Sequence, residues 1–158
     1  MDAFDDALRV IESLNQHGVD YAVVGGVALN VHGLVRATED IDIFVRPDPA
    51  NIERLRAALK AVWPDPDIEQ ITAEDLCGDY PAVRYGPPQG TLYLDILTRL
   101  GEATRFSDLE IEHKDVAGIV VRVATARTLY RMKRNTVRAI DRADAQALRV
   151  AFHLDEEG

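Results

Sequence analysis

The chain lacks the residues that mark several common protein classes. It contains one cysteine, Cys77, so it cannot form an internal disulfide or a cysteine-based zinc site. The histidines are scattered and show no metal-ligand spacing (His17, His32, His113 and His153). The sequence has no P-loop and no G-x-G-x-x-G dinucleotide motif. These absences exclude a disulfide-stapled protein, a zinc domain and two familiar nucleotide-binding loops.

Long apolar runs are also absent. No apolar stretch is long enough to span a membrane, and residues 1–6 lack the basic start and apolar stretch of a signal peptide. The 158 residues, 47 % of them hydrophobic, suit one domain with a real core. We expect a single domain over residues 1–158, with its core at residues 20–124 and a helical segment at residues 125–154. We expect it to be cytoplasmic and to have no membrane partner.

The net charge of −9 argues against an RNA partner, but this charge is unevenly distributed. Residues 122–149 carry a net charge of +6, and the rest of the chain carries −15. Such a basic segment can hold a triphosphate or an RNA backbone. Alternatively, its arginines form salt bridges to the acidic body, and the sequence does not decide between the two. The charged residues of the segment are Arg122, Arg127, Arg131, Lys133, Arg134, Arg138, Asp141, Arg142, Asp144 and Arg149.

Apolar periodicity and turn residues predict a sheet with flanking helices in mixed order, which is an α+β or α/β fold with a mixed sheet. The expected strands are residues 20–24, 40–46, 80–85, 91–98, 109–114 and 119–124. The expected helices are residues 2–17, 26–33 and 50–62, a short one after Thr72, and a C-terminal region that Thr125 caps and that breaks near residues 135–137.

The most informative motif is a Gly-Gly turn followed by two carboxylates. Gly25 and Gly26 end an apolar strand, and Asp40 and Asp42 lie in the next one. Side chains two apart on a strand point the same way, so both carboxylates aim at one spot. They repel each other unless a cation lies between them, and hard oxygen ligands suit Mg²⁺ together with substrate phosphates. The glycine backbone can approach a phosphate closely. A solvated acidic pair at a strand end is the alternative.

A third acid lies in another apolar strand. Asp95 is flanked by Leu94 and Ile96, and burying an unpaired carboxylate is costly. Asp95 therefore needs a metal, a basic partner or a strand end that is open to solvent. The simpler alternative is a surface position on an edge strand.

Together these motifs resemble the DNA polymerase β-type nucleotidyltransferase superfamily, in which an apolar strand, Gly-Gly or Gly-Ser and about a dozen residues precede Asp-x-Asp. Within it, the chain is similar to the AbiEii-like branch, which includes nucleotidyltransferase toxins of bacterial toxin–antitoxin systems. Residues 36–42 and 129–133, followed by Arg138, Asp141 and Asp144, carry this likeness. One difference is Gly26, where many members have serine, so a phosphate contact from a hydroxyl is missing there.

The resemblance implies a nucleotidyltransferase fold and a set of site residues. Asp40, Asp42 and Asp95 would be catalytic and would hold one or two Mg²⁺ ions. Lys133 would contact the nucleotide phosphates, and one of two helix acids would fix Lys133 or an arginine; an ordinary surface lysine is the alternative. The residues implied in binding the nucleoside triphosphate (NTP) are Gly25, Gly26, Arg36, Thr38, Lys133, Asp141 and Asp144.

The resemblance also implies an activity, namely Mg²⁺-dependent transfer of a nucleoside monophosphate from an NTP to a hydroxyl acceptor. The implied acceptor is RNA, in particular a tRNA 3′ end, and the implied protein partner is a cognate antitoxin. Three alternatives remain open: an enzyme acting on a protein or a small molecule, a non-catalytic antitoxin or binding module that kept the fold, and an unrelated α/β domain in which Asp-Ile-Asp is coincidental.

Overall fold

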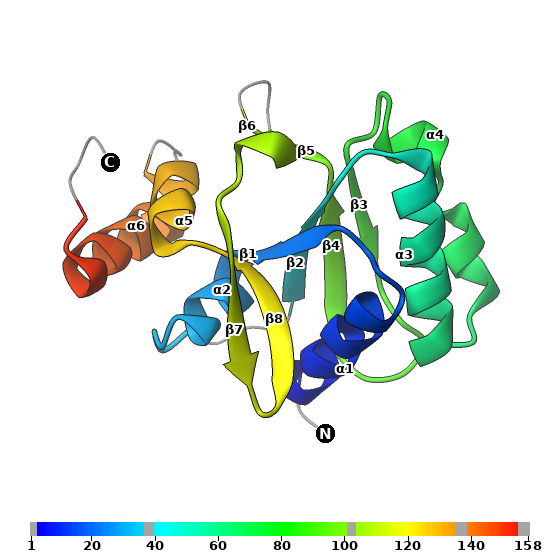
Figure 1. Ribbon diagram of the computed structural model, residues 1–158, viewed down its shortest axis with the longest axis horizontal. Coiled ribbons are helices and arrows are strands. Elements are labelled where there is room, and N and C mark those ends of the chain that lie inside the picture. The colour runs from blue at the N-terminus through cyan, green and yellow to red at the C-terminus, as the bar shows by residue number, and fades with distance from the viewer. Residues whose placement is uncertain (1–2, 37–39, 101–103, 135–138, 155–158) are drawn as a thin grey trace.

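A computed structural model describes residues 3–36, 40–100, 104–134 and 139–154 and arranges them around a six-stranded mixed sheet (Figure 1). Strands β1 and β2, β3 and β4, and β7 and β8 pair antiparallel, whereas β2 and β4, and β1 and β8, pair parallel. This sheet with its flanking helices confirms the expected α+β class. In their order across the sheet, the strands are β3 (Ala82–Tyr85), β4 (Tyr93–Leu97), β2 (Asp40–Val45), β1 (Tyr21–Val24), β8 (Ile119–Ala124) and β7 (Ile111–Val116).

Two long helices, α1 (Ala3–Gln16) and α3 (Pro49–Val62), pack against each other. The Asp48 side chain caps α3 by accepting a hydrogen bond from the backbone N–H of Ala50, at 2.9 Å. The apolar residues of both helices recur at helical spacing and are buried in the core, where each contributes about 1.5–3 kcal/mol. They include Leu8, Ile11 and Leu14 of α1 and Ile52, Leu55 and Leu59 of α3.

The other helices are shorter or lie towards the C-terminus, and each contacts a different part of the fold. The short helix α2 (Gly25–Val31) follows β1 directly and contacts β2, and α4 (Ala73–Leu76) contacts α3. Helices α5 (Ala126–Lys133) and α6 (Ala139–Phe152) pack together at the end of the molecule away from α3 and α4 (Figure 1). The Thr125 side chain caps α5 by accepting a hydrogen bond from the N–H of Thr128, as the sequence predicts.

The strands alternate as expected around the acidic motif. In β2, Ile41 and Ile43 are fully buried, while Asp40 and Asp42 occupy the opposite face and are partly exposed. In β4, Leu94 and Ile96 are fully buried, so Asp95 also lies on the partly exposed face. The period-two prediction for these carboxylates is therefore confirmed.

Element boundaries differ from the prediction in two hairpins. The second strand of the β3–β4 hairpin begins at Tyr93 rather than at residue 91, because the connection includes two prolines and Gly90 at φ +83°. The β7–β8 turn is tighter than expected, since Val116 pairs with Ile119 and both intervening residues have positive φ. Short elements that the sequence did not predict are β5 (Arg99–Leu100), β6 (Thr104–Arg105), η1 (Pro66–Gln70) and η2 (Phe106–Asp108). No helix among the described residues is long and apolar enough to cross a membrane.

Candidate active site

The sheet places the three predicted carboxylates on neighbouring strands. Asp42 of β2 and Asp95 of β4 are direct partners in the parallel register, and Asp40 pairs with Tyr93 two residues earlier in each strand. Paired residues of adjacent strands point to the same face. Because β2 and β4 are separated by about fifty residues in sequence, this meeting depends on the strand order, which places β4 beside β2.

The carboxylates crowd one another, and this crowding changes the acidity of Asp42. Burial raises the pKa of Asp42 to about 7, and a hydrogen bond with Asp95 and the negative charges of Asp95 and Asp40 add to the rise. The positive charge of Lys133 acts in the opposite direction. Strand β2 thus holds a carboxyl group that binds a proton more tightly than an ordinary aspartate, and a metal cation bound beside it would favour the charged form.

Gly25 leaves the space in which the Asp42 carboxylate lies. Its φ is +73°, a conformation that other residues rarely adopt. A Cβ atom at this position would overlap Oδ2 of Asp42 and stand 2.8 Å from its Cγ. The first glycine of the Gly-Gly turn is therefore required on two independent grounds, the backbone conformation and the close approach of the aspartate.

The helices α5 and α6 bring a basic residue to the same place. The Nζ atom of Lys133 lies 3.3 Å from Oδ1 of Asp141 and 3.2 Å from Oδ2 of Asp144. Asp144 also forms an ion pair with Arg36, whose Nε lies 3.4 Å from Oδ1 of the aspartate. Both helix acids therefore contact Lys133. Arg36 follows α2, which itself begins at Gly25, so the pair with Asp144 connects the glycine side of the site to α6.

Two residues that the sequence analysis did not select lie beside the carboxylates. The Nη2 atom of Arg84 is 3.0 Å from Oδ1 of Asp40, and its Nε is 3.6 Å from Oδ1 of Asp95. Its guanidinium also lies 4.5 Å from the centre of the Tyr93 ring, which is 46 % exposed. Alternation along β4 would have found Tyr93, since it lies two residues before Asp95. Arg84 required the hairpin register, which pairs it with Asp95.

The donor set fits magnesium in its chemistry. The three carboxylates offer hard oxygen ligands on one face, and a cation would relieve the repulsion that raises the Asp42 pKa. In their present conformations, however, no three acidic, histidine or cysteine side chains among the described residues are grouped closely enough to hold a metal. Among the oxygens of the three carboxylates, Arg84 contacts only Oδ1 of Asp40 and Oδ1 of Asp95. Thr38 lies outside the described residues.

Part of the basic C-terminal segment is engaged in ion pairs. Arg131 pairs with Glu110 at 3.4 Å, and Arg122 pairs with Asp20 at 2.8 Å. These contacts agree with the alternative that the segment makes salt bridges to the acidic body. Lys133 differs from these arginines because its charge also acts on Asp42, a residue of the candidate site.

The mixed sheet, the glycine turn and the facing carboxylates are features of a nucleotidyltransferase, and comparison with known proteins agrees. A family model described as the nucleotidyl transferase AbiEii toxin of type IV toxin–antitoxin systems matches residues 6–145. The chain therefore belongs to the AbiEii nucleotidyltransferase family. No individually curated protein sequence matches the chain.

Solved structures show the same fold at low sequence identity. The protein ANT(2″)-Ia, in complex with adenylyl-2″-tobramycin, aligns with a TM-score of 0.58 and 11 % identity over 94 % of this chain and 88 % of that one. An antigenic nucleotidyltransferase-like protein of Paracoccidioides brasiliensis aligns with a TM-score of 0.55 and 20 % identity over 92 % and 77 %. A Thermotoga maritima protein assigned as a nucleotidyltransferase aligns with a TM-score of 0.52 and 15 % identity over 94 % and 91 %.

Proposed function

We propose that the protein transfers a nucleoside monophosphate from an NTP to a hydroxyl group of RNA, in particular at a tRNA 3′ end, with Mg²⁺ as the metal. In this proposal the chain is the toxin of a toxin–antitoxin pair, and its protein partner is the cognate antitoxin. The observation that carries it is the meeting of Asp42 and Asp95 on adjacent parallel strands, with the charge of Lys133 acting on the same carboxylate.

Each residue has a distinct task in this reaction. Asp40, Asp42 and Asp95 would hold the metal, which when bound neutralises charge on the triphosphate and lowers the pKa of the attacking hydroxyl. Lys133 would bind the nucleotide phosphates as a point charge, and Asp141 and Asp144 hold its ammonium group in place.

The reaction itself replaces a phosphoanhydride bond of the NTP with a phosphoester bond to the acceptor. The hydroxyl oxygen forms a bond to the α-phosphorus, the bond between the α-phosphorus and the bridging oxygen breaks, and pyrophosphate leaves. Asp95 would accept the proton of the hydroxyl. The protein then acts mainly by positioning the two substrates and stabilising charge.

Two residues beside the carboxylates support a nucleic acid as the acceptor in this proposal. Tyr93 presents an exposed ring next to the carboxylates, and Arg84 lies over it. Aromatic rings and arginine planes stack on unpaired bases, and arginine binds phosphate. Tyr93 also lines a cavity of about 460 Å³, together with Gly86, Pro87, Gly90, Thr91 and Leu92.

The experiment is label transfer. The protein is incubated with each of four α-labelled NTPs, Mg²⁺, total cellular RNA and protein extract. The variants Asp40→Ala and Asp42→Ala are compared with Asp79→Ala, an exposed acid outside the site. Label on RNA from the wild type and from Asp79→Ala, but from neither site variant, is the expected result.

The other outcomes separate the alternatives. Label on a protein or a small molecule would retain the transfer reaction and replace the acceptor. A ligand that binds only the folded state must raise the melting temperature. If no acceptor is labelled and no NTP raises that temperature in Mg²⁺, the protein does not bind NTP, and the fold has been kept for binding a partner.

A further inference from the structure

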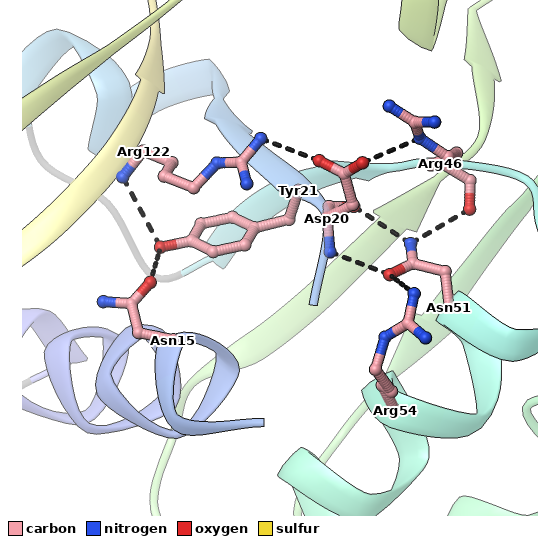
Figure 2. A network of polar contacts seen from close by, with 7 residues as sticks. All are labelled: Asn15, Asp20, Tyr21, Arg46, Asn51, Arg54 and Arg122. Carbon is pink, nitrogen blue, oxygen red and sulfur yellow. Dashed lines mark hydrogen bonds and ion pairs between the residues drawn. The ribbon is translucent and has the colours of Figure 1, made fainter. Parts of the chain in front are cut away.

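A second cluster of charged residues lies at the other end of β1 from Gly25. Asp20 directly precedes β1 and receives two guanidinium groups, from Arg46 after β2 and from Arg122 in β8. The Arg46 Nε–Asp20 Oδ2 distance is 2.7 Å and the Arg122 Nη2–Asp20 Oδ1 distance is 2.8 Å. Figure 2 shows the two arginines reaching the carboxylate from opposite sides. One aspartate thus orients two arginines.

Buried polar groups hold this arrangement in place. Asn51 of α3 is fully buried; its amide oxygen accepts from the N–H of Asp20 at 2.7 Å, and its amide nitrogen donates to the carbonyl groups of Asp20 and Arg46 at 3.0 and 3.1 Å. The hydroxyl of Tyr21, whose pKa burial raises to about 12, donates to Oδ1 of Asn15 at 2.8 Å. The same hydroxyl accepts from the backbone N–H of Arg122 (Figure 2). The backbone positions of both arginines are therefore set from inside the fold.

A cavity of about 490 Å³ opens beside these arginines. Arg105 also lines it, and within the described part of the chain Arg105 has no ion-pair partner. The apolar part of the lining includes Phe106, Leu109 and Ile111, with Arg46 lying 5.6 Å from the centre of the Phe106 ring. The charged groups that line the cavity are three arginines and Asp20, an excess of two positive charges in a chain whose net charge is −9.

The arginines retain donors beyond those that Asp20 accepts. A guanidinium group has five N–H donors in a planar fork that matches the oxygens of a phosphate. Asp20 accepts from Nε of Arg46 and from Nη2 of Arg122. The Nε atom of Arg122 is buried and has no hydrogen-bond partner. Each oxygen of Asp20 therefore has one arginine partner, and most donors of the two guanidinium groups are not used by Asp20.

We infer that this cavity is a second anion site, separate from the carboxylate site, and that it binds a phosphate group. The phosphate belongs either to the backbone of an RNA chain or to a free polyphosphate, since both present the same oxygens to the three arginines. The apolar lining beside Phe106 gives room for the base or ribose attached to that phosphate. An RNA phosphate bound here would increase the affinity for RNA at a place away from the reacting hydroxyl. This gain in affinity would not depend on the chemistry at Asp42.

The test measures binding in EDTA with two probes, inorganic pyrophosphate by calorimetry and a labelled single-stranded RNA 12-mer by anisotropy. One variant combines Arg46→Gln with Arg105→Gln, and the other is Arg105→Gln alone. The single variant leaves both Asp20 ion pairs in place, so it still tests the site if the double variant does not fold. Arg9→Gln, an exposed α1 residue that pairs with Asp6, is the matched control, and Lys133→Gln reports binding at the carboxylate site.

We expect the double variant to weaken binding of at least one probe by about 10-fold, and Arg105→Gln alone to weaken it less, while Arg9→Gln binds as the wild type does. The RNA affinity should also depend less on salt, by about 1.4 units of log–log slope, because each phosphate contact of a single strand contributes about 0.7. Loss of RNA binding alone identifies a backbone phosphate, and loss of pyrophosphate binding alone identifies a free polyphosphate. If both arginine variants bind both probes as the wild type does, or if only Lys133→Gln weakens them, the inference is wrong.

Discussion

Asp42 of β2 and Asp95 of β4 face each other across adjacent parallel strands, and Gly25 has no side chain where the Asp42 carboxylate lies. This relationship makes the first catalytic prediction specific. Gly25→Ala would add a methyl group that overlaps Oδ2 of Asp42, so the carboxylate must leave its present position. We expect Gly25→Ala to lose transfer activity by about 100-fold or more, as for other displaced catalytic groups.

The control for Gly25→Ala separates this overlap from backbone strain. Gly18 has a similar φ of +67°, but a Cβ there would meet nothing within 4 Å. Gly18→Ala should therefore cost about 1 kcal/mol of unfolding free energy and keep its activity. Equal activity in the two variants, measured by label transfer, would show that the position of Asp42 does not limit the reaction.

Asp42 should make the protein less stable as the pH rises, when no metal is present. Its pKa is raised to about 7 in the folded protein, so folding favours the protonated form. The stability from this group is complete below its ordinary pKa, declines as the pH rises towards 7, and is absent above it. Asp42→Asn cannot ionise, so in EDTA we expect it to melt several degrees above the wild type at pH 8 and close to it at pH 4. Melting curves at both values check this, and a constant difference would contradict it.

Lys133 should serve nucleotide binding and stability together. Lys133→Ala removes the ammonium group that lies within 3.3 Å of Asp141 and Asp144, and leaves those two acids close together. We expect the KM for NTP to rise about 10-fold and the melting temperature to fall. The control is Arg131→Ala, which changes a residue on the same helix as Lys133 and removes its exposed ion pair with Glu110. This variant should change neither value much. A lower melting temperature with an unchanged KM would make Lys133 a purely structural residue.

Arg84 and Tyr93 should act on the acceptor and not on the nucleotide. Both lie on the β3–β4 side of the carboxylates, away from α5 and Lys133. Arg84→Gln and Tyr93→Ala should each raise the KM for RNA about 5- to 30-fold, since stacking on one base contributes about 1–3 kcal/mol. The KM for NTP should stay near that of the wild type. Tyr80→Ala and Arg99→Gln, which change exposed residues of the same types, are the controls, and an equal rise in both KM values would contradict the assignment.

Much of the fold follows from the sequence because its signals are local. The alternation of Asp40, Ile41, Asp42 and Ile43 gives a strand with one acidic face, and the cap at Thr125 gives the start of α5. Each of these depends on residues within one element. The family resemblance then supplied the association of Asp95 with Asp42, which the parallel register of β2 and β4 now gives in detail.

The sequence did not give features that depend on pairing between distant segments. Arg84 lies in an exposed edge strand with no marked pattern, and only the observed register places it beside Asp95. The hairpin loop expected from the sequence ends at residue 90, and that shorter loop would have paired Arg84 with a residue other than Asp95. The Asp20 cluster is similar, because its arginines come from the end of β2 and the middle of β8, about eighty residues apart in sequence. The roles of the site residues stay predictions until the variants are measured.

The strand order has a consequence for the newly made chain. A ribosome completes Asp40, Asp42 and Asp95 before it has made α5 and α6, and β8, the neighbour of β1, is also late. Lys133 follows Asp95 by thirty-eight residues, and its partner Asp144 comes later still. A nascent chain of this length therefore carries the three carboxylates of β2 and β4 before it carries Lys133. If the proposed roles hold, this order would delay nucleotide transfer until α5 and α6 have been made.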